Sequence, residues 1–161
     1  MRAKVAYFGV FMALALIFSY VEVLIPIPLG IPGIKLGLAN LIIVVALYKV
    51  HIQETYVLSV GRILLAGFLF GSLFSILYSM AGGLLSLTVM HFLRKTGKFS
   101  VMGVSLAGGV FHNLGQLIMA MIVLESGSIF YYFPVLLIAG MLTGLLIGII
   151  ANESIKRLSI G

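Results

Sequence analysis

The sequence predicts an all-α integral membrane protein, a compact bundle of six transmembrane helices that residues 1–161 form as a single domain. Composition is the first reason: 62% of the residues are hydrophobic and 9% are charged, whereas soluble domains are about 45–50% apolar and about 25% charged. The second is that long apolar runs recur along the chain, which a signal peptide followed by a soluble domain does not show. The third is that the alternating pattern of a transmembrane β-barrel is absent.

The first helix is expected over residues 5–25. Its start is basic, but its apolar stretch is too long for a signal peptide and no small-residue cleavage site follows, so we expect it to be retained. It stops at PIPLGIPG, residues 26–33, because three prolines and two glycines exclude a continuous helix. The second helix is expected over residues 36–50, which is short for a hydrocarbon core of about 30 Å.

The remaining helices follow from the lengths of the apolar runs. Residues 55–92 are too many for one span, and the pair Gly71–Ser72 divides them into a third and a fourth helix. The fifth helix is expected over residues 101–124 and the sixth over residues 132–151. An even number of spans places both termini on the same side of the membrane.

The distribution of lysine and arginine predicts which side that is. Eight basic residues fall on the side of the termini, only Lys35 falls on the other, and Arg62 lies inside a predicted helix. This bias predicts a multi-pass protein of the cell membrane with both termini in the cytoplasm. The eight are Arg2, Lys4, Lys49, Arg94, Lys95, Lys98, Lys156 and Arg157.

The basic run RKTGK, residues 94–98, does not indicate a nucleic-acid partner, because it is short and lacks interleaved aromatic residues. It is most simply a topology signal, with docking of a cytoplasmic partner or an anionic membrane lipid as the alternative.

Enzyme, metal and cofactor signatures are missing from the sequence. There is no cysteine, which excludes disulfides and thiolate metal sites. There are no paired carboxylates, no Asp-rich motif of the kind that binds Mg²⁺-diphosphate, and no Walker loop for ATP. The histidines, His51, His91 and His112, are scattered and match no metal spacing. We therefore expect no catalytic residues, no metal and no cofactor.

The stretch GVFHNLGQLIMA, residues 109–120, is a polar island in an apolar chain. At 100° per residue, Ser105, His112, Asn113 and Gln116 share an arc of about 100° on the fifth helix. Lipid cannot satisfy such groups, so the stripe should face the protein interior or a water-accessible cavity. Two interpretations remain open: hydrogen bonds that hold the bundle together, on average about 0.6 kcal/mol each, or ligand binding by His112, Asn113 and Gln116.

Arg62 is the strongest single signal, because a guanidinium in a membrane helix keeps its charge and needs a partner. Glu22 is the only acidic residue predicted within a span, and an ion pair between the two is the economical interpretation. Their predicted depths differ, since Arg62 lies towards the inner side and Glu22 near the outer end of the first helix. If they do not meet, Arg62 is available for a ligand phosphate or carboxylate.

A third polar group is expected at the outer mouth of the bundle. Lys35 and Asn40 stand at the start of the second helix, where a helix N-terminus favours an anion; the alternative for Lys35 is a lysine that snorkels to the interface. Tyr78 on the fourth helix is a further candidate ligand contact, or a buried aromatic that makes a hydrogen bond.

Small residues spaced four apart predict close helix contacts. Gly140, Gly144 and Gly148 form such a row on the sixth helix, Gly67 and Gly71 on the third. Ala15 and Ser19 form a weaker pair on the first helix. These rows serve either packing within the chain or docking against another membrane subunit, and we take Ala15 and Ser19 as the candidate docking pair.

Three stretches together carry a family resemblance: PGIKLGLANL at 32–41, GRILLAGFLFGSLFSILYSMAGGLLS at 61–86 and GVFHNLGQL at 109–117. They are similar to the membrane family named both Gx transporter and heptaprenyl diphosphate synthase component I. The family in turn resembles the substrate-binding S components of energy-coupling-factor (ECF) transporters. That resemblance implies six helices, a small molecule bound from the outer side, and a separate transmembrane subunit with ATPases as partners.

The expected function is therefore a substrate-binding subunit of an ECF-like transporter for a small anionic or amphipathic molecule. Arg62 and Lys35 would supply charge, and Asn40, Tyr78, His112, Asn113 and Gln116 would supply hydrogen bonds. One alternative is a non-catalytic accessory subunit of isoprenoid, heptaprenyl diphosphate or demethylmenaquinone metabolism, or a component of flavin-based extracellular electron transfer. Another is a structural assembly protein without a ligand.

Overall fold

The computed structural model describes residues 2–25 and 37–158, in which every regular element is a helix. Five of these helices are long and apolar enough to cross a membrane, and α2 is a shorter apolar helix. The predicted all-α membrane bundle is confirmed. The elements are α1 (Arg2–Leu24), α2 (Leu38–Lys49), α3 (Ile52–Phe70), α4 (Leu73–Thr96), α5 (Val101–Val123), the short 3₁₀ helix η1 (Gly127–Tyr132) and α6 (Phe133–Arg157).

Helix ends follow local capping chemistry more closely than hydropathy. The predicted break at Gly71–Ser72 is present, and Ser72 caps α4 with its Oγ, which accepts from the backbone N of Ser75 at 3.3 Å. The third helix begins three residues earlier than predicted, because His51 and Glu54 form a capping box at its start. The fourth continues past residue 92 to Thr96 and ends before Gly97 in the left-handed region.

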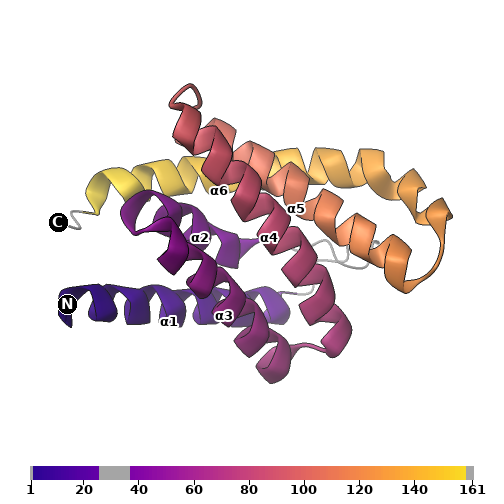
Figure 1. Cartoon of the computed structure of the whole chain (residues 1–161), viewed down its shortest axis with the longest axis horizontal. Coiled ribbons are helices and arrows are strands. Elements are labelled where there is room, and N and C mark those ends of the chain that lie inside the picture. The colour runs from indigo at the N-terminus through magenta and orange to yellow at the C-terminus, as the bar shows by residue number, and fades with distance from the viewer. Residues whose placement is uncertain (1, 26–36, 159–161) are drawn as a thin grey trace.

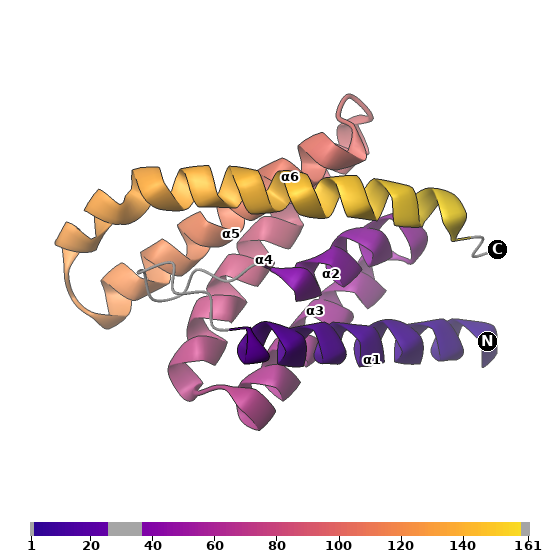
Figure 2. The same cartoon turned by 180° about the vertical axis from the view of Figure 1, so that it is seen from behind.

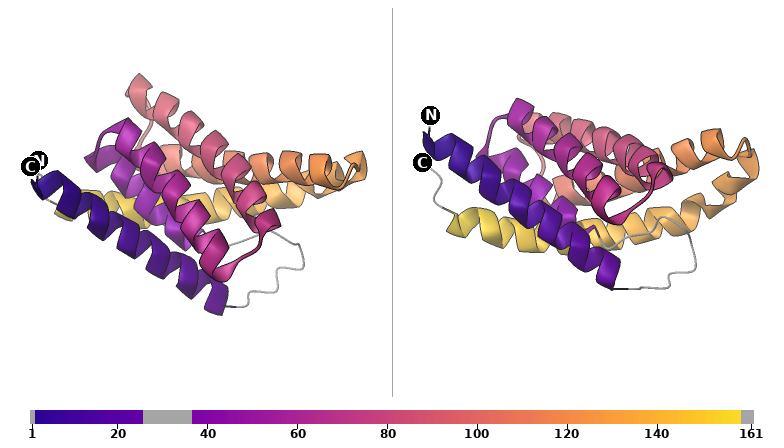
Figure 3. Two further views of the ribbon diagram at one scale, coloured as in Figure 1. Left: turned by 60° about the horizontal axis from the view of Figure 1, so that its bottom comes forward. Right: turned by 90° about the horizontal axis from the view of Figure 1, so that it is seen from below.

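The long helices do not all stand parallel, because α3 and α4 slope across the others (Figure 1). The axes of α1 and α6 are roughly parallel, with the chain running along them in opposite directions and α2 between them, and α3 and α4 pass obliquely across this group (Figures 1 and 2). Helices α5 and α6 lie side by side and are joined through η1. The beginning of α1 and the end of α6 lie at the same end of the molecule (Figure 3), as an even number of passes requires.

Helix α2 forms the centre of the packed core. Its twelve residues include an unbroken buried run from Ile42 to Leu47, and it contacts α1, α3 and α6. A helix that is apolar on all sides is buried on all sides. At 1.5 Å per residue it is about 18 Å long, which is less than a membrane core needs, and its position inside the bundle explains why that short length suffices.

The glycine row of the sixth helix is used within the chain. A Cβ atom placed on Gly144 would lie 2.7 Å from the carbonyl oxygen of Ser105, and one on Gly148 would lie 2.8 Å from the Cα of Met102. The Ser105 hydroxyl donates to the Gly144 carbonyl at 2.7 Å across the same contact. Packing within the chain, the first of the two interpretations, therefore holds for this row.

The small pair on the first helix also packs within the chain, as in the first of its two interpretations. Ala15 is fully buried in the main hydrophobic core and Ser19 is 7% exposed. The Ser19 hydroxyl donates to the carbonyl of Ala15 at 2.8 Å. Because α1 packs this face against α2 and α3, a partner helix cannot reach it in this structure.

Candidate functional site

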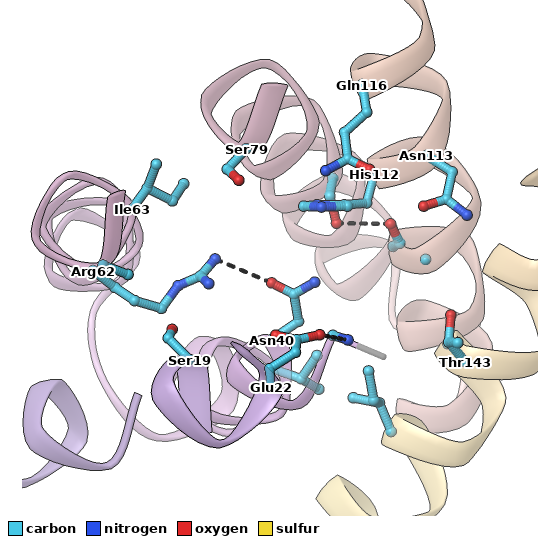
Figure 4. Close-up of a pocket in the computed structure, with 18 of the residues that line it drawn as sticks. Ser19, Glu22, Asn40, Arg62, Ile63, Ser79, His112, Asn113, Gln116 and Thr143 are labelled. Carbon is cyan, nitrogen blue, oxygen red and sulfur yellow. Dashed lines mark hydrogen bonds between the residues drawn. The ribbon is translucent and has the colours of Figure 1, made fainter. Parts of the chain in front are cut away.

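A cavity of about 80 Å³ lies where the helices cross, and residues of all six α-helices line it. Polar side chains from distant parts of the chain converge on it (Figure 4). A water molecule occupies about 30 Å³ in the liquid, so the space suits a few waters or one small chemical group. The polar lining residues are Ser19, Glu22, Asn40, Arg62, Ser75, Ser79, Ser86, Ser105, His112, Asn113, Gln116 and Thr143.

Arg62 reaches this cavity from the middle of α3. It lies ten residues after the helix begins at Ile52, about 15 Å along the axis at 1.5 Å per residue, and only 8% of it is exposed. Its Nη2 donates to Oδ1 of Asn40 at 3.2 Å (Figure 4). Its Nε is buried and makes no hydrogen bond within the part of the chain that the structure describes. The guanidinium thus has donor capacity left over at the cavity.

Glu22 lines the same cavity as Arg62, which the depths predicted from sequence did not anticipate. Its Oε1 accepts a hydrogen bond from the backbone N of Gly37, next to α2, and its carboxylate attracts the guanidinium electrostatically. The two come together because α3 starts at Ile52 and so places Arg62 deeper than expected. The cavity therefore holds one positive and one negative side chain among its described lining residues.

The polar stripe of α5 faces this cavity as predicted, and its residues make different kinds of contact. Asn113 is 9% exposed, and its Nδ2 donates to the Leu136 carbonyl on α6 at 2.7 Å. Like Ser105, it ties α5 to α6, so the structural interpretation of the stripe holds for these two residues. Both still border the cavity.

His112 and Gln116 lie one helical turn apart at the cavity wall formed with α4 (Figure 4). Gly82 of α4 makes room for both: a Cβ there would stand 2.8 Å from the Cγ of Gln116 and 3.2 Å from the Cε1 of His112. The absence of a side chain at Gly82 therefore lets an imidazole and an amide lie together at the cavity.

Two predicted site residues remain to be placed, Tyr78 and Lys35. Tyr78 is half-buried and is not one of the described lining residues, whereas its neighbour Ser79 is. One residue along a helix changes the direction of the side chain by 100°, so Tyr78 points elsewhere than Ser79, and its predicted ligand contact stays a prediction. Lys35 lies outside the described residues.

The sequence analysis missed several lining residues, notably Ser86 and Thr143. Small hydroxyl residues in membrane helices usually bond to backbone carbonyls and so give little signal. Ser86 does so with Gly108 at 2.8 Å, and Thr143 with Ala139 at 2.9 Å. Gly82 and Gly83 were the available clue that α4 approaches another helix closely at this level.

Comparison with protein families decides the assignment of the chain. The model of the family described as heptaprenyl diphosphate synthase component I matches residues 11–154. The chain belongs to this family. No curated protein and no solved structure matches it. The name heptaprenyl diphosphate synthase component I describes one component of a multi-subunit assembly. Among the described residues, no group of three or more His, Cys, Asp or Glu side chains is placed to hold a metal ion.

Proposed function

We propose that this protein is the substrate-binding membrane subunit of an ECF-like transporter. The observation that carries the proposal is the convergence of a buried guanidinium, a carboxylate, amides and an imidazole from different helices on one cavity. Buried polar groups are costly in a membrane and are most often found where a ligand or ion is handled. A small molecule with an anionic group would meet Arg62, and its other polar groups would meet Asn40, His112, Asn113 and Gln116.

The size of the cavity suggests how binding would proceed. Sites for small molecules usually measure about 300–1,000 Å³, and this cavity measures about 80 Å³. We infer that this is a contracted form of the site, in which ligand entry would require helices to separate. An anionic group would take Arg62 from its contact with Asn40. We propose that this exchange of partners opens the cavity.

Orientation is part of the proposal. The beginning of α1 and the end of α6 lie at the same end of the molecule (Figure 3). Lys49 belongs to this end too, since its Nζ donates to the carbonyl of Leu158 at 2.5 Å. By the positive-inside rule this end would face the cytoplasm, so the ligand would enter from the outer side.

Native mass spectrometry tests the binding role. Protein purified in mild detergent is expected to retain a small molecule whose mass identifies it. Gln116→Ala should lower its retention about threefold to tenfold, the worth of one hydrogen bond. Arg62→Lys, which keeps the charge but loses the planar fork, should lower it about tenfold or more.

Gln53→Ala is the matched control, because it makes the same chemical change as Gln116→Ala but away from the cavity. Gln53 is exposed near the start of α3. Equal retention by the wild type and by both cavity variants would contradict the proposed site.

The family's name supports a second candidate, a non-catalytic membrane subunit that holds an isoprenoid diphosphate for a separate synthase. Arg62 suits a diphosphate as well as a carboxylate. Affinity purification of the tagged protein separates the two. Recovery of an ECF transmembrane subunit with ATPases supports the transporter, and recovery of a prenyltransferase supports the accessory subunit.

A further inference from the structure

A second hollow lies away from the cavity, where the turn between α2 and α3 faces the last turns of α4. It measures about 410 Å³ and is lined by Val50, His51, Ile52, His91, Arg94 and Lys95. We call it the basic groove. Four of these six lining residues are basic or histidine, and none of the six is acidic. This contrasts with the cavity, where Glu22 accompanies Arg62.

Arg94 is held in position before any ligand arrives. Its Nη1 donates to the carbonyl of Leu47 at the end of α2, and its guanidinium lies 5.0 Å from the centre of the Tyr48 ring. A guanidinium has several N–H donors in a fixed plane, so one bond to a carbonyl leaves others for an anion. A fixed arginine loses little conformational entropy on binding.

The other lining residues add donors and positive potential. His51 caps the start of α3, where the helix dipole favours an anion. The neighbouring acid, Glu54, accepts from the His51 backbone at 3.3 Å and is not a lining residue of the groove. Nδ1 of His91 is buried and makes no hydrogen bond to any residue that the structure describes. The groove therefore combines two cations with a histidine nitrogen that has no hydrogen bond among the described residues.

Exposed apolar side chains lie near the lining residues of the groove in the sequence. Phe92 follows His91 in the chain and is 62% exposed, and Val57, about a turn and a half into α3, is 61% exposed. In a membrane bundle such side chains face lipid, while the ends of the helices lie at the level of the headgroups. The chemistry of such a groove suits phosphate oxygens, and the exposed apolar side chains suit acyl chains. We propose that the basic groove binds the phosphate headgroup of a membrane lipid.

The test uses the full-length protein in vesicles of phosphatidylcholine with a minor fraction of phosphatidic acid, followed by native mass spectrometry of the retained lipids. The wild type should retain phosphatidic acid in preference to phosphatidylcholine. Lys95→Gln should lower this retention about fivefold, the typical effect of one basic residue near an anionic surface. Lys98→Gln is the matched control, because this substitution removes the same charge from the same basic run. Lys98 is also exposed, but it does not line the groove.

Three results would overturn the proposal. Equal losses in Lys95→Gln and Lys98→Gln would mean that the lipid responds to net charge and not to the groove. Displacement of phosphatidic acid by an equal concentration of inorganic phosphate would assign the groove to free phosphate. Failure of the wild type to prefer phosphatidic acid would remove lipid as the occupant. Gln116→Ala should leave lipid retention unchanged, so this test and that of the proposed function fail independently.

Discussion

The contact between α5 and α6 should be intolerant of a single added methyl group at Gly144. A Cβ there would lie 2.7 Å from the carbonyl oxygen of Ser105 and 2.9 Å from the Cα of Leu106. Both atoms belong to the backbone of α5, so no side chain can turn aside to make room. The two helices would have to separate, and the hydrogen bond from Ser105 to the Gly144 carbonyl, 2.7 Å long, would stretch with them.

The size of the effect follows from the geometry. Ordinary contacts begin near 3.4 Å, so the backbones must move apart by about 0.7 Å, enough for neighbouring atoms to lose a quarter to a half of their attraction. Overpacking of this kind costs about 1–3 kcal/mol, and the better helix propensity of alanine returns up to about 1 kcal/mol. We expect a net loss of about 1–2 kcal/mol in the free energy of unfolding from Gly144→Ala.

Thermal stability in detergent measures this loss. For a chain of this size, 1 kcal/mol corresponds to about 2–4 °C in Tm, so Gly144→Ala should lower Tm by about 2–8 °C. Gly103→Ala is the matched control on α5, because the nearest atom to its added Cβ is 3.6 Å away; it should be neutral or stabilising. If Gly144→Ala left Tm unchanged or raised it, as is expected of Gly103→Ala, then α5 and α6 would not approach each other as closely as described here.

Two further predictions concern the α3–α4 turn and the charges of the cavity. Ser72→Ala removes the hydroxyl that accepts from the Ser75 backbone and should lower the free energy of unfolding by about 1 kcal/mol, measured as a fall in Tm; an unchanged Tm would mean that the cap does not form. For Arg62 and Glu22, a double-mutant cycle of Arg62→Gln and Glu22→Gln should give a coupling of about 1–3 kcal/mol in stability, because loss of either leaves an uncompensated charge in a buried site. Additive effects in this cycle would show that the two charges do not interact.

The number, order and approximate ends of the helices could be predicted from the sequence because they depend on local chemistry. A break at Gly71–Ser72 needs only a residue that ends one helix and a hydroxyl that starts the next. The shared face of His112, Asn113 and Gln116 needs only the helical period, and all three line the cavity. These predictions involve residues within a few positions of one another, so the unknown tertiary arrangement did not enter them.

Predictions that depended on how helices cross were less successful. The depths estimated for Arg62 and Glu22 assumed upright helices, whereas the structure places both at one cavity. The small pair on α1 indicated a close contact, but periodicity alone does not say which helix makes it. Ser19 lies inside the bundle and lines the cavity. A difference of one position, as between Tyr78 and Ser79, is enough to turn a side chain away from the cavity.

The two charged side chains of the cavity, Arg62 and Glu22, can serve either stability or ligand binding. Replacing a buried ion pair by apolar residues is often neutral or stabilising, so such a pair is weak evidence of a role in stability. Arg62 is nine-tenths buried and retains an Nε without a hydrogen bond among the described residues. A purely structural guanidinium would be expected to use all its donors, because each unsatisfied buried donor costs about 1–3 kcal/mol. The arrangement is better explained if a ligand oxygen completes it, which makes Arg62 the residue on which the binding hypothesis depends most.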